Sequence, residues 1–324
     1  MLSWPNSISS MDLKYKKILV TGGAGFLGQH IVSKLKNKGV QKEDILIPRS
    51  QDLDLRVKEN CEKVVKGINV IIHAAGATGG VDFHKRNPAI AFYDNLIMGV
   101  ELMEAARKEA VEKFVTIGSA ASYPDNAPLP YKEEDLWIGP PEETHAPYTV
   151  AKKMLLVQGQ AYRRQYGLNV IHLLMTNMYG PLEPISYVIP MLIDKITKAK
   201  TSGGRVEVWG TGRPTRDFLF VEDAADGIIL ATEKYDKPEP VNLASGKEIS
   251  ISDLVNIVCR HMNFDGEVFW DTSKPDGQSR RLLDTSRAEK EFGFKASTDF
   301  SEGCEKTIRY HSSPKIHSLS KNGY

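Results

Sequence analysis

The feature that most constrains the fold is a glycine-rich turn between an apolar strand and an amphipathic helix. Residues 17–21 are rich in β-branched side chains, as expected of a strand buried on both faces. Gly22, Gly25 and Gly28 follow at intervals of three, and a helical pattern begins directly afterwards. Such glycines permit a tight turn, close approach of the backbone to a pyrophosphate and close packing of helix on strand. We therefore predict a dinucleotide-binding unit in an α/β fold with a doubly wound parallel sheet.

The end of the second strand bears on the choice of dinucleotide. Residues 44–47 form this strand, and Arg49 and Ser50 follow it. NAD-binding units usually place an acidic residue here to bind the ribose hydroxyls, whereas a basic residue accommodates the 2′-phosphate of NADP. Arg49 and Ser50 therefore favour NADP(H). The alternative is that Arg49 is a solvated loop cation.

Further strand ends extend the expected cofactor site. The strand at residues 69–73 ends in His73, which we expect to be packed and hydrogen-bonded rather than catalytic. The small residues Ala74, Ala75 and Gly76 come next and let the backbone approach a flat ligand. A long helical pattern then runs from residue 88 to about residue 109 and contains Asn95.

Three polar residues in the middle of the chain are candidates for catalysis. Ser119 ends the strand at residues 113–117, and the carboxyl ends of such strands face the ligand crevice. Tyr148 and Lys152 are four apart in a helical pattern that runs to residue 166, so they share a face. An ammonium beside a phenol lowers the phenol's pKa from its usual value near ~10, which suits Tyr148 to proton transfer. A Tyr/Lys pair alone also occurs by chance, so its meaning depends on Ser119 and the glycine turn.

Composition and charge exclude several other functions. Hydrophobic residues make up 41% of the 324-residue chain and charged residues 26%, and the formal net charge is +1. These values are ordinary for a globular protein and give no sign of a nucleic-acid or membrane partner. The N-terminus lacks the features of a signal peptide, and the three cysteines are too scattered for a disulfide framework or a metal site. We expect a cytoplasmic protein without a metal.

The alternation of predicted strands and helices breaks into shorter pieces after residue 180, which indicates a second lobe. We predict a Rossmann domain at residues 16–180 and 217–245, with residues 217–221 and the following helix returning to the main sheet. A smaller substrate-binding lobe would comprise residues 181–216 and 246–311, and residues 1–15 and 312–324 would be loose. The Pro-rich stretch at residues 120–146 is too long for a mere connector, and we expect it to form a wall of the site.

Together these motifs resemble the extended short-chain dehydrogenase/reductase superfamily over roughly residues 16–311. The C-terminal half is most similar to the GDP-L-fucose synthases, in segments 176–181, 188–190, 208–212, 216–218 and 274–284. The resemblance implies NADPH as reductant and a nucleoside-diphosphate 4-keto-6-deoxysugar as substrate, with GDP the expected nucleotide. It places the substrate against Asn177, Val188, Trp209, Arg216 and Arg281. The alternatives are that Trp209 is a core residue and that Arg216 pairs with Asp217 or Asp223.

The resemblance also implies the contacts of the cofactor and the roles of the catalytic group. Tyr148 would donate a proton, Ser119 would hold the substrate carbonyl, and Lys152 would tune Tyr148 and bind the nicotinamide ribose. The residues expected to bind the cofactor are Gly22, Gly25, Phe26, Leu27, Gly28, Arg49, Ser50, Ala74, Ala75, Gly76, Asn95 and Lys152. In this superfamily the helices that begin near residues 88 and 148 usually form a dimer interface, so we expect a homodimer.

One departure from the GDP-L-fucose synthases narrows the expected reaction. Those enzymes epimerise C3 and C5 of the sugar with a Cys and a His, and this chain has Ala121 and Tyr187 at those places. Alanine carries no exchangeable proton, and a tyrosine of ordinary pKa is a poor substitute for histidine. We therefore expect an NADPH-dependent 4-keto reductase without C3/C5 epimerisation. The alternatives are a bifunctional 3,5-epimerase/4-reductase with a rearranged acid/base, an epimerase that retains NAD, and a non-catalytic nucleotide-binding protein.

Overall fold

The computed structural model describes residues 10–274 and 276–313, and its centre is a parallel sheet of six strands. The strand order is β2-β1-β3-β4-β5-β9, and all five neighbouring pairs are parallel. The order reverses between β1 and β3, and ligands of such sheets bind at the carboxyl ends of strands beside this switch point. The strands are β1 (Ile18–Thr21), β2 (Ile45–Leu46), β3 (Val70–His73), β4 (Lys113–Ser119), β5 (Val170–Met175) and β9 (Val241–Leu243).

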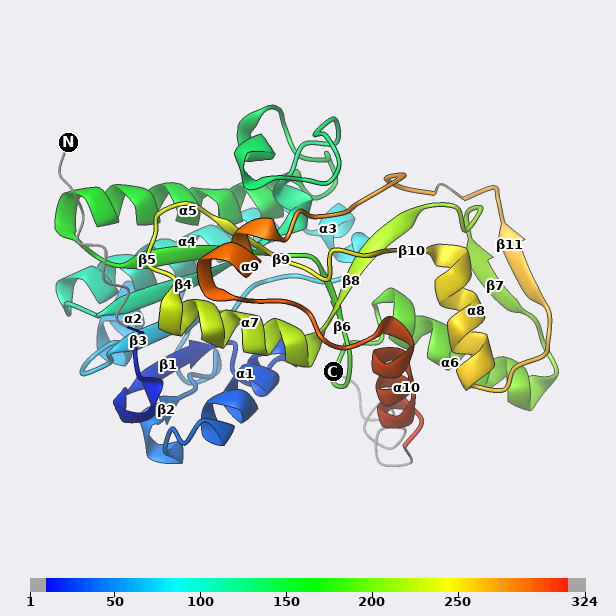
Figure 1. Ribbon diagram of the computed structural model, residues 1–324, viewed down its shortest axis with the longest axis horizontal. Helices are drawn as coiled ribbons and strands as arrows, with labels where there is room; N and C mark the ends of the chain where they lie inside the picture. The colour runs from blue at the N-terminus through cyan, green and yellow to red at the C-terminus, as the bar shows by residue number, and fades with distance from the viewer. Residues whose placement is uncertain (1–9, 275, 314–324) are drawn as a thin grey trace.

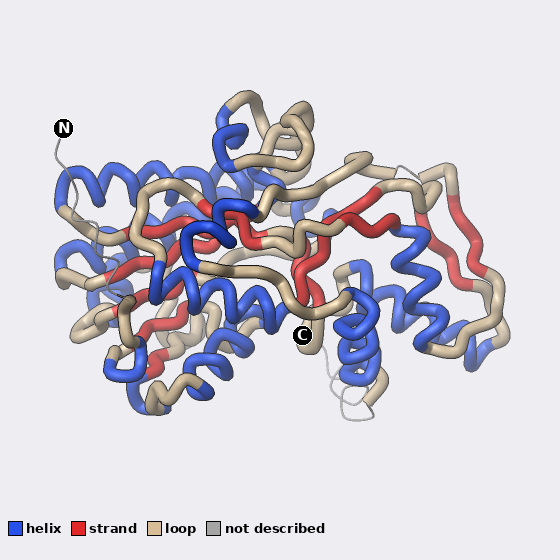
Figure 2. Tube along the Cα trace, in the orientation of Figure 1, coloured by secondary structure: helices blue, strands red, loops and turns tan. Residues whose placement is uncertain are grey.

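Helices cover both faces of this sheet, which confirms the expected doubly wound α/β fold (Figures 1 and 2). Alternate strand residues point to opposite faces. Ile18 and Val20 accordingly join one core cluster with α1, α7 and α9, whereas Leu19 joins another with α2, α4 and α5. The helices are α1 (Phe26–Asn37), α2 (Lys58–Val64), α3 (Val81–Arg86), α4 (Pro88–Lys108), α5 (Ala146–Tyr166), α7 (Val221–Lys234) and α9 (Ser286–Phe292).

A smaller lobe stands beside the sheet, at the right of Figure 1, and has its own hydrophobic cluster. It contains a three-stranded sheet in the order β10-β8-β6 and a parallel pair of β11 and β7. Three helices pack on these strands. The elements are β6 (Asn177–Tyr179), α6 (Val188–Ser202), β7 (Val206–Trp209), β8 (Thr215–Phe220), β10 (Glu248–Ser250), α8 (Ile251–His261), β11 (Val268–Asp271) and α10 (Phe300–His311).

The expectation that residues 217–221 return to the main sheet is wrong. They belong largely to β8, which pairs with β6 and β10 in the three-stranded sheet. The place beside β5 in the main sheet is taken by β9 instead. The following helix, α7, does pack against α1, so the chain re-enters the main domain one element later than predicted.

Two other expected boundaries also differ from the structure. Residues 286–294 were expected in the smaller lobe, but Phe292 packs on Tyr235 and joins the cluster of α1 and α7. Residues 10–15 were expected to be loose, but Leu13 is buried and the backbone N–H of Met11 donates to the carbonyl of Glu233. Apolar burial anchors both segments to the main domain. The rest of the expected loose N-terminus, and residues 314–324, lie outside the described residues.

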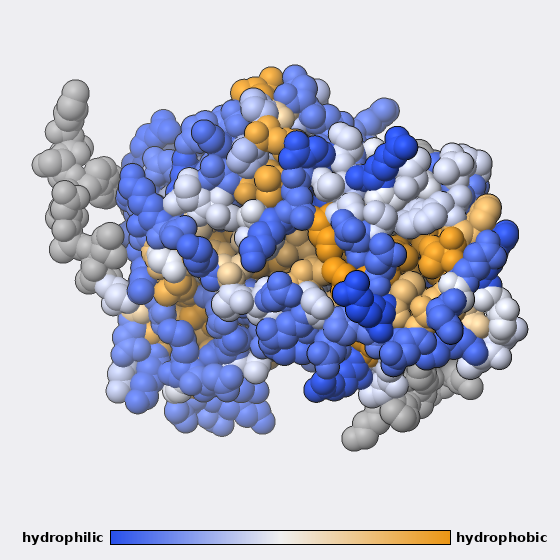
Figure 3. Space-filling view, turned by 45° about the vertical axis from the view of Figure 1, so that its right-hand side comes forward, coloured by the Kyte–Doolittle hydropathy of each residue, from blue (hydrophilic) through white to orange (hydrophobic). Residues whose placement is uncertain are grey.

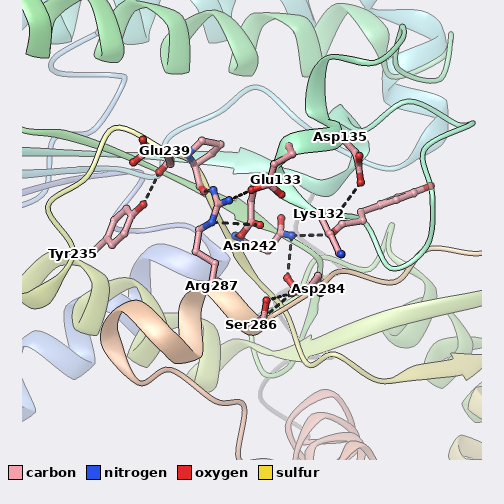
Figure 4. Close-up of polar contacts among 12 residues, drawn as sticks. Lys132, Glu133, Asp135, Tyr235, Glu239, Asn242, Asp284, Ser286 and Arg287 are labelled. Carbon is pink, nitrogen blue, oxygen red and sulfur yellow. Dashed lines mark hydrogen bonds and ion pairs between the residues drawn. The ribbon is translucent and has the colours of Figure 1, made fainter. Parts of the chain in front are cut away.

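The segment at residues 120–145 is fixed to the edge of the main sheet by Asn242 of β9 (Figure 4). The Asn242 side chain donates to the carbonyls of Tyr131 and Asp284, and it accepts a bond of 2.7 Å from the Tyr123 hydroxyl. Its backbone N–H donates to the buried carboxylate of Glu133. Two short 3-10 helices, η3 (Ala120–Ser122) and η4 (Glu133–Trp137), lie within this segment, which is therefore ordered by buried polar contacts.

The outer surface seen from the side of the smaller lobe is mostly hydrophilic, with bands of hydrophobic residues in its central part (Figure 3). None of the helices formed by residues 10–274 and 276–313 combines the length and the apolar character needed to cross a bilayer.

Candidate functional site

The glycine turn lies at the switch point of the main sheet and is packed too tightly for larger residues. Gly22 has a φ of +67°, and a Cβ placed there would lie 2.8 Å from the backbone nitrogen of Ala75. A Cβ on Gly28 would collide with the carbonyl oxygen of Gly22. Gly25 caps the N-terminus of α1, whose free N–H groups favour an anion. The three glycines thus hold β1, α1 and the end of β3 together around the site where a pyrophosphate binds in such folds.

Hydrogen bonds of Thr21 hold His73 and Ala75, at the end of β3, next to the glycine turn. The Thr21 hydroxyl lies 2.8 Å from Nδ1 of His73 and accepts a bond of 3.2 Å from the backbone N–H of Ala75. His73 is fully buried, and this burial, with the nearby Lys152, lowers the pKa of its imidazole to about 3. His73 is therefore a neutral packed residue, as the sequence predicted.

Asn95 and Lys152 converge beside Gly76. A Cβ placed on Gly76 would lie 2.9 Å from Oδ1 of Asn95 and 3.3 Å from Nζ of Lys152. The Asn95 amide donates to the carbonyls of Ala77 and Ala91, while its buried Oδ1 has no partner among the described residues. Such an orphaned acceptor is costly unless a ligand supplies a donor. The unpartnered Oδ1 of Asn95, the lack of a side chain at Gly76 and the glycine turn together fit a bound nicotinamide dinucleotide.

Lys152 and Tyr148 lie on one face of α5, as predicted from their spacing. Nζ of Lys152 is 5.9 Å from the centre of the Tyr148 ring and donates to the carbonyl of Ala75 over 3.2 Å. Burial lowers the pKa of the Lys152 ammonium to about 8. The pKa of Tyr148, however, is raised to about 12, first by burial and then by the neighbouring Tyr187 phenol. The expected lowering of this pKa by Lys152 is therefore wrong for the structure as it stands, in which burial of the phenol dominates.

Ser119 ends β4, at the carboxyl edge of the main sheet. Its hydroxyl oxygen accepts a bond of 3.2 Å from the backbone N–H of Ala121, which leaves the hydroxyl proton available to a ligand. Ser122 donates to the carbonyl of Thr149, the residue after Tyr148, so the turn that carries Ser119 abuts the N-terminal part of α5.

Arg216 and Arg281 come together at the border of the smaller lobe. Segment 279–281 runs beside β8, because the backbone N–H groups of Thr215 and Asp217 donate to the carbonyls of Ser279 and Arg281. Burial lowers the pKa of both guanidinium groups, that of Arg216 to about 10, and the charge of Arg281 lowers that of Arg216 further. Two partly buried cations this close are costly unless an anion joins them.

Neither arginine forms an ion pair with a carboxylate in the part of the chain that the structure describes. Arg216 donates to the carbonyl of Thr215, and Arg281 donates to the side-chain oxygen of Gln278. The alternative pairing of Arg216 is wrong, since Asp217 accepts from Ser245 and Gly246. Asp223 is likewise engaged by Ser297 and Thr298. Two neighbouring guanidinium groups without a carboxylate partner have the donor geometry that suits a phosphate or other anion.

The remaining predicted site residues are distributed over both lobes. Trp209 ends β7 and is 60% exposed, with the Lys274 ammonium 5.7 Å from its ring, so the alternative of a core residue is wrong. Asn177 begins β6 and Val188 begins α6, and both are half-buried. Arg49 and Ser50 are exposed, two and three residues beyond Ile47, whose side chain packs on Gly23. Phe26 and Leu27 form the first turn of α1.

Four residues near Tyr148 were not predicted as part of the site. Thr78 and His84 follow the end of β3, Glu142 precedes α5, and Glu183 follows β6. Glu183 is buried with one carboxylate oxygen unpartnered among the described residues, and burial raises the pKa of its carboxyl group to about 8. No spacing or motif in the sequence sets these residues apart, since their proximity arises from loop packing. Within residues 10–274 and 276–313, no three His, Cys, Asp or Glu side chains are grouped to hold a metal ion.

Comparison with known proteins agrees with this geometry. The model of the NAD dependent epimerase/dehydratase family matches residues 18–244, more than half of the chain. The chain belongs to this family. It is 38% identical over 299 residues to the GDP-L-fucose synthase of Sinorhizobium fredii, a match that covers 90% of this chain and 94% of that protein. It is 31% identical over 307 residues to the GDP-L-colitose synthase of Yersinia pseudotuberculosis, covering 91% of this chain and 97% of that protein.

A solved structure of a family relative is also similar. The GDP-mannoheptose C4 reductase from Campylobacter jejuni with NADP bound superimposes with a TM-score of 0.85 at 26% identity, covering 93% of this chain and 99% of that one. These similarities confirm the resemblance to extended short-chain dehydrogenases/reductases and to the GDP-L-fucose synthases. As a member of this epimerase/dehydratase family, the chain is an NAD(P)-dependent enzyme of the kind that reduces or epimerises nucleotide sugars.

Proposed function

We propose that this enzyme is an NADPH-dependent reductase of the C4 carbonyl of a nucleoside-diphosphate 4-keto-6-deoxysugar, without epimerisation at C3 or C5. The observation that carries the proposal is the combination of a reductase group with an alanine at the family's epimerase position. Ser119, Tyr148 and Lys152 border the switch point of the sheet, and Ala121 stands two residues beyond Ser119. Ala121 offers only its backbone N–H, which is already donated to Ser119.

Each residue of the reductase group has a distinct task in this reaction. NADPH, when bound, supplies the hydride. Ser119 donates its free hydroxyl proton in a hydrogen bond to the C4 carbonyl oxygen and so holds it near Tyr148. Tyr148 then transfers a proton to the developing alkoxide. Lys152 binds the ribose next to the nicotinamide and stabilises negative charge on Tyr148.

Tyr187 does not restore the missing acid/base pair. It caps α6 at the position where the related synthases carry histidine, and burial raises the pKa of its phenol above the ordinary value. A phenol with a raised pKa is almost entirely protonated at neutral pH and cannot remove a proton from C3 or C5. This supports reduction without enolisation.

The arginine pair supports GDP as the nucleotide of the substrate, and Arg49 and Ser50 support NADPH as the reductant. Arg216 and Arg281 offer two forked donors to a diphosphate, and the named relatives act on GDP-linked sugars. Arg49 and Ser50 are free at the surface to receive the 2′-phosphate of NADPH, and the C4 reductase relative has NADP bound. GDP is therefore the proposed nucleotide, and NADPH the proposed reductant.

Two measurements on a panel of GDP-, dTDP-, UDP- and CDP-linked 4-keto-6-deoxysugars test the proposal. Oxidation of NADPH by the wild-type enzyme should be fastest with the GDP sugar and slower with NADH. Tyr148→Phe should lower kcat by about 10²–10⁴-fold, the usual contribution of a positioned acid, while NADPH still binds. Proton NMR of the product formed in D₂O should show no deuterium at C3 or C5. Deuterium at either carbon would refute the reductase-only proposal and favour the bifunctional alternative.

We also propose that the enzyme is a homodimer joined through α4 and α5. These two helices pack on each other along one side of the main sheet (Figure 1). They leave large apolar side chains exposed to solvent, namely Ile90, Phe92, Tyr93 and Val157. Large apolar side chains exposed on two neighbouring helices favour association.

A further inference from the structure

Beside the reductase group lies a cluster of ionisable side chains that the proposed reaction does not use. The His84 ring, on α3, lies between two other rings, with its centre 5.2 Å from that of Tyr148 and 4.8 Å from that of His145. Nδ1 of His145 is 2.5 Å from a carboxylate oxygen of Glu142. His145 and Glu142 therefore lie next to His84, the histidine that packs on Tyr148.

His84 is buried among polar groups of the loop that follows β3. Only 4% of its surface is exposed, and a hydrogen bond with the backbone of Gly79 raises the pKa of its imidazole against the larger effect of burial. Nε2 of His84 lies 3.5 Å from the hydroxyl of Thr78.

Thr78 connects His84 to the catalytic phenol. Its hydroxyl hydrogen-bonds toward Tyr148 and toward Tyr187, and it lowers the pKa of each phenol against the larger effect of burial. A single hydroxyl thus stands between His84 and the Tyr148 oxygen. Because a hydroxyl both donates and accepts, it can pass a proton from one to the other.

The far end of the cluster reaches solvent. The side chains of His145 and Glu142 are 26% and 31% exposed, in contrast to the buried His84. Although burial opposes it, hydrogen bonds from His145 and Thr144 lower the pKa of the Glu142 carboxyl to about 2, so Glu142 is a carboxylate at neutral pH. The cluster therefore extends from the surface to Tyr148, with the His145, His84 and Tyr148 rings packed in succession.

We propose that His84 returns a proton to Tyr148, through Thr78, after each turnover. His84 in turn takes a proton from His145, which exchanges with solvent under the influence of Glu142. His84 and Thr78 are thus positioning residues that act through Tyr148, and the inference rests on the proposed reductase function.

The protons and electrons of the cycle balance as follows. Hydride addition breaks the C4=O double bond, and the carbonyl oxygen takes the Tyr148 proton, so that a ketone becomes an alcohol and Tyr148 a phenolate. His84 first takes a proton from His145 and becomes an imidazolium. Thr78 then gives its hydroxyl proton to the phenolate and receives the Nε2 proton of His84, which returns to the neutral form, while His145 regains a proton from solvent. The net uptake is one hydride from the nicotinamide reductant and one proton.

The charges that face His84 come from several elements. Burial and the charge of His145 lower the pKa of His84, while a hydrogen bond with the backbone of Gly79 and the Glu142 carboxylate raise it. The Arg281 guanidinium lies within electrostatic range of Glu142, and Tyr187 faces Tyr148 from α6. Binding of an anion between the arginines would therefore also change the charge balance of the relay.

Rapid mixing of enzyme, NADPH and the 4-keto sugar separates proton return from hydride transfer. In wild type, every turnover proceeds at a similar rate. His84→Phe keeps an aromatic ring against Tyr148 but cannot carry a proton. It should oxidise one NADPH per site at the wild-type rate, because Tyr148 starts out protonated, and then slow by about 10-fold or more. Thr78→Val should show the same burst, and the slow phase of both variants should have an increased solvent isotope effect.

His261→Gln provides the matched control. His261 also bonds a hydroxyl, that of Ser301, but it lies on α8 in the smaller lobe, away from Tyr148. This variant should show no burst and a wild-type kcat. If His84→Phe and Thr78→Val keep the wild-type kcat, the relay is refuted. It is also refuted if their first turnover slows as much as later ones, since the residues would then only shape the site.

A measurement without substrate distinguishes failure of the relay from failure of the proposed function. In ¹⁵N-histidine NMR of the full chain, the pH titration of the His84 ring should shift in Tyr148→Phe and in His145→Gln, and it should not shift in His261→Gln. An unchanged His84 titration in both variants overturns the relay even if the reductase activity is found. A wild-type enzyme that reduces no 4-keto sugar overturns the proposed function, while this titration still decides whether the groups are coupled.

Discussion

At the scale of single residues, Lys152 lowers the stability of the fold but has a role in the proposed reaction. Its ammonium is buried with a single hydrogen bond, to the carbonyl of Ala75, and burial lowers its pKa from 10.5 to about 8. A buried charge that lacks a counter-ion destabilises the folded state. The residue is therefore costly to the fold, and its retention at this place is consistent with its proposed role at the cofactor ribose and Tyr148.

Lys152→Met should stabilise the protein at neutral pH and inactivate it. Between about pH 8 and pH 10.5 the unfolded chain binds the Lys152 proton and the folded chain does not, so the free energy of unfolding of wild type rises with pH across this window. Below pH 8 the variant should be more stable than wild type by up to about 3 kcal/mol, the equivalent of the pKa shift. The advantage should disappear near pH 10.5. Urea unfolding at pH 7 and pH 10 measures both differences, and an equal difference at the two pH values would contradict the expectation.

At the scale of elements, the hydrogen bonds of Asn242 join segments of the chain whose relative positions matter for the proposed reaction. Its side chain fixes Tyr131 and Asp284, and backbone bonds between Tyr131 and residues 282–284 fix the segment that carries Arg281. The position of Arg281 in the proposed anion site therefore depends on Asn242, a residue of the main sheet.

Asn242→Ala should destabilise the protein and weaken substrate binding. The substitution removes three hydrogen bonds, to the carbonyls of Tyr131 and Asp284 and from the Tyr123 hydroxyl, which should lower the free energy of unfolding by about 3 kcal/mol. KM for the nucleotide sugar should rise more than kcat falls, because Arg281 is displaced and the reductase group is not. Urea unfolding and steady-state kinetics measure the two effects.

Two other substitutions provide reference values for the loss in the free energy of unfolding. Tyr123→Phe removes one bond to Asn242 and should cost about 1 kcal/mol. Gln160→Ala removes an exposed bond to the carbonyl of Pro238 and should change the free energy of unfolding by less than about 0.5 kcal/mol. An Asn242 variant as stable as the Gln160 variant would show that the network does not hold the segment.

The elements that could be predicted from the sequence are those with strong local patterns. The Gly22–Gly28 spacing predicted the turn and the sheet around it, and the four-residue spacing of Tyr148 and Lys152 placed both on one face of α5. Residues 217–221 were misplaced because their apolar pattern suits any buried strand and does not specify its partner. The environment of His84 could not be predicted, since its own segment, with Thr78, is brought beside the distant segment of His145 and Tyr148 only by the fold.

At the scale of the whole molecule, the surfaces of α4 and α5 bear on how many chains make up the enzyme. Tyr93 is 60% exposed and Val157 is 43% exposed, on two helices that lie against each other. The buried face of α4 supplies Asn95 and that of α5 supplies Tyr148 and Lys152. A dimer through the outer faces would therefore stiffen the two helices that carry the reductase group, with no need for the partner to contribute residues to the site.

The double substitution Tyr93→Glu with Val157→Glu tests this proposed dimer. Charged side chains at the centre of an apolar contact cost more than they do in water, so the variant should sediment as a monomer at concentrations where wild type sediments as a dimer. If dimerisation stiffens α4 and α5, kcat should fall as the variant dissociates, while each chain stays folded. Tyr15→Glu changes a side chain that is 76% exposed outside these helices and should leave the dimer intact. Wild type that sediments as a monomer at all concentrations would exclude the interface, and an unchanged dimer in the double variant would place it elsewhere on the surface.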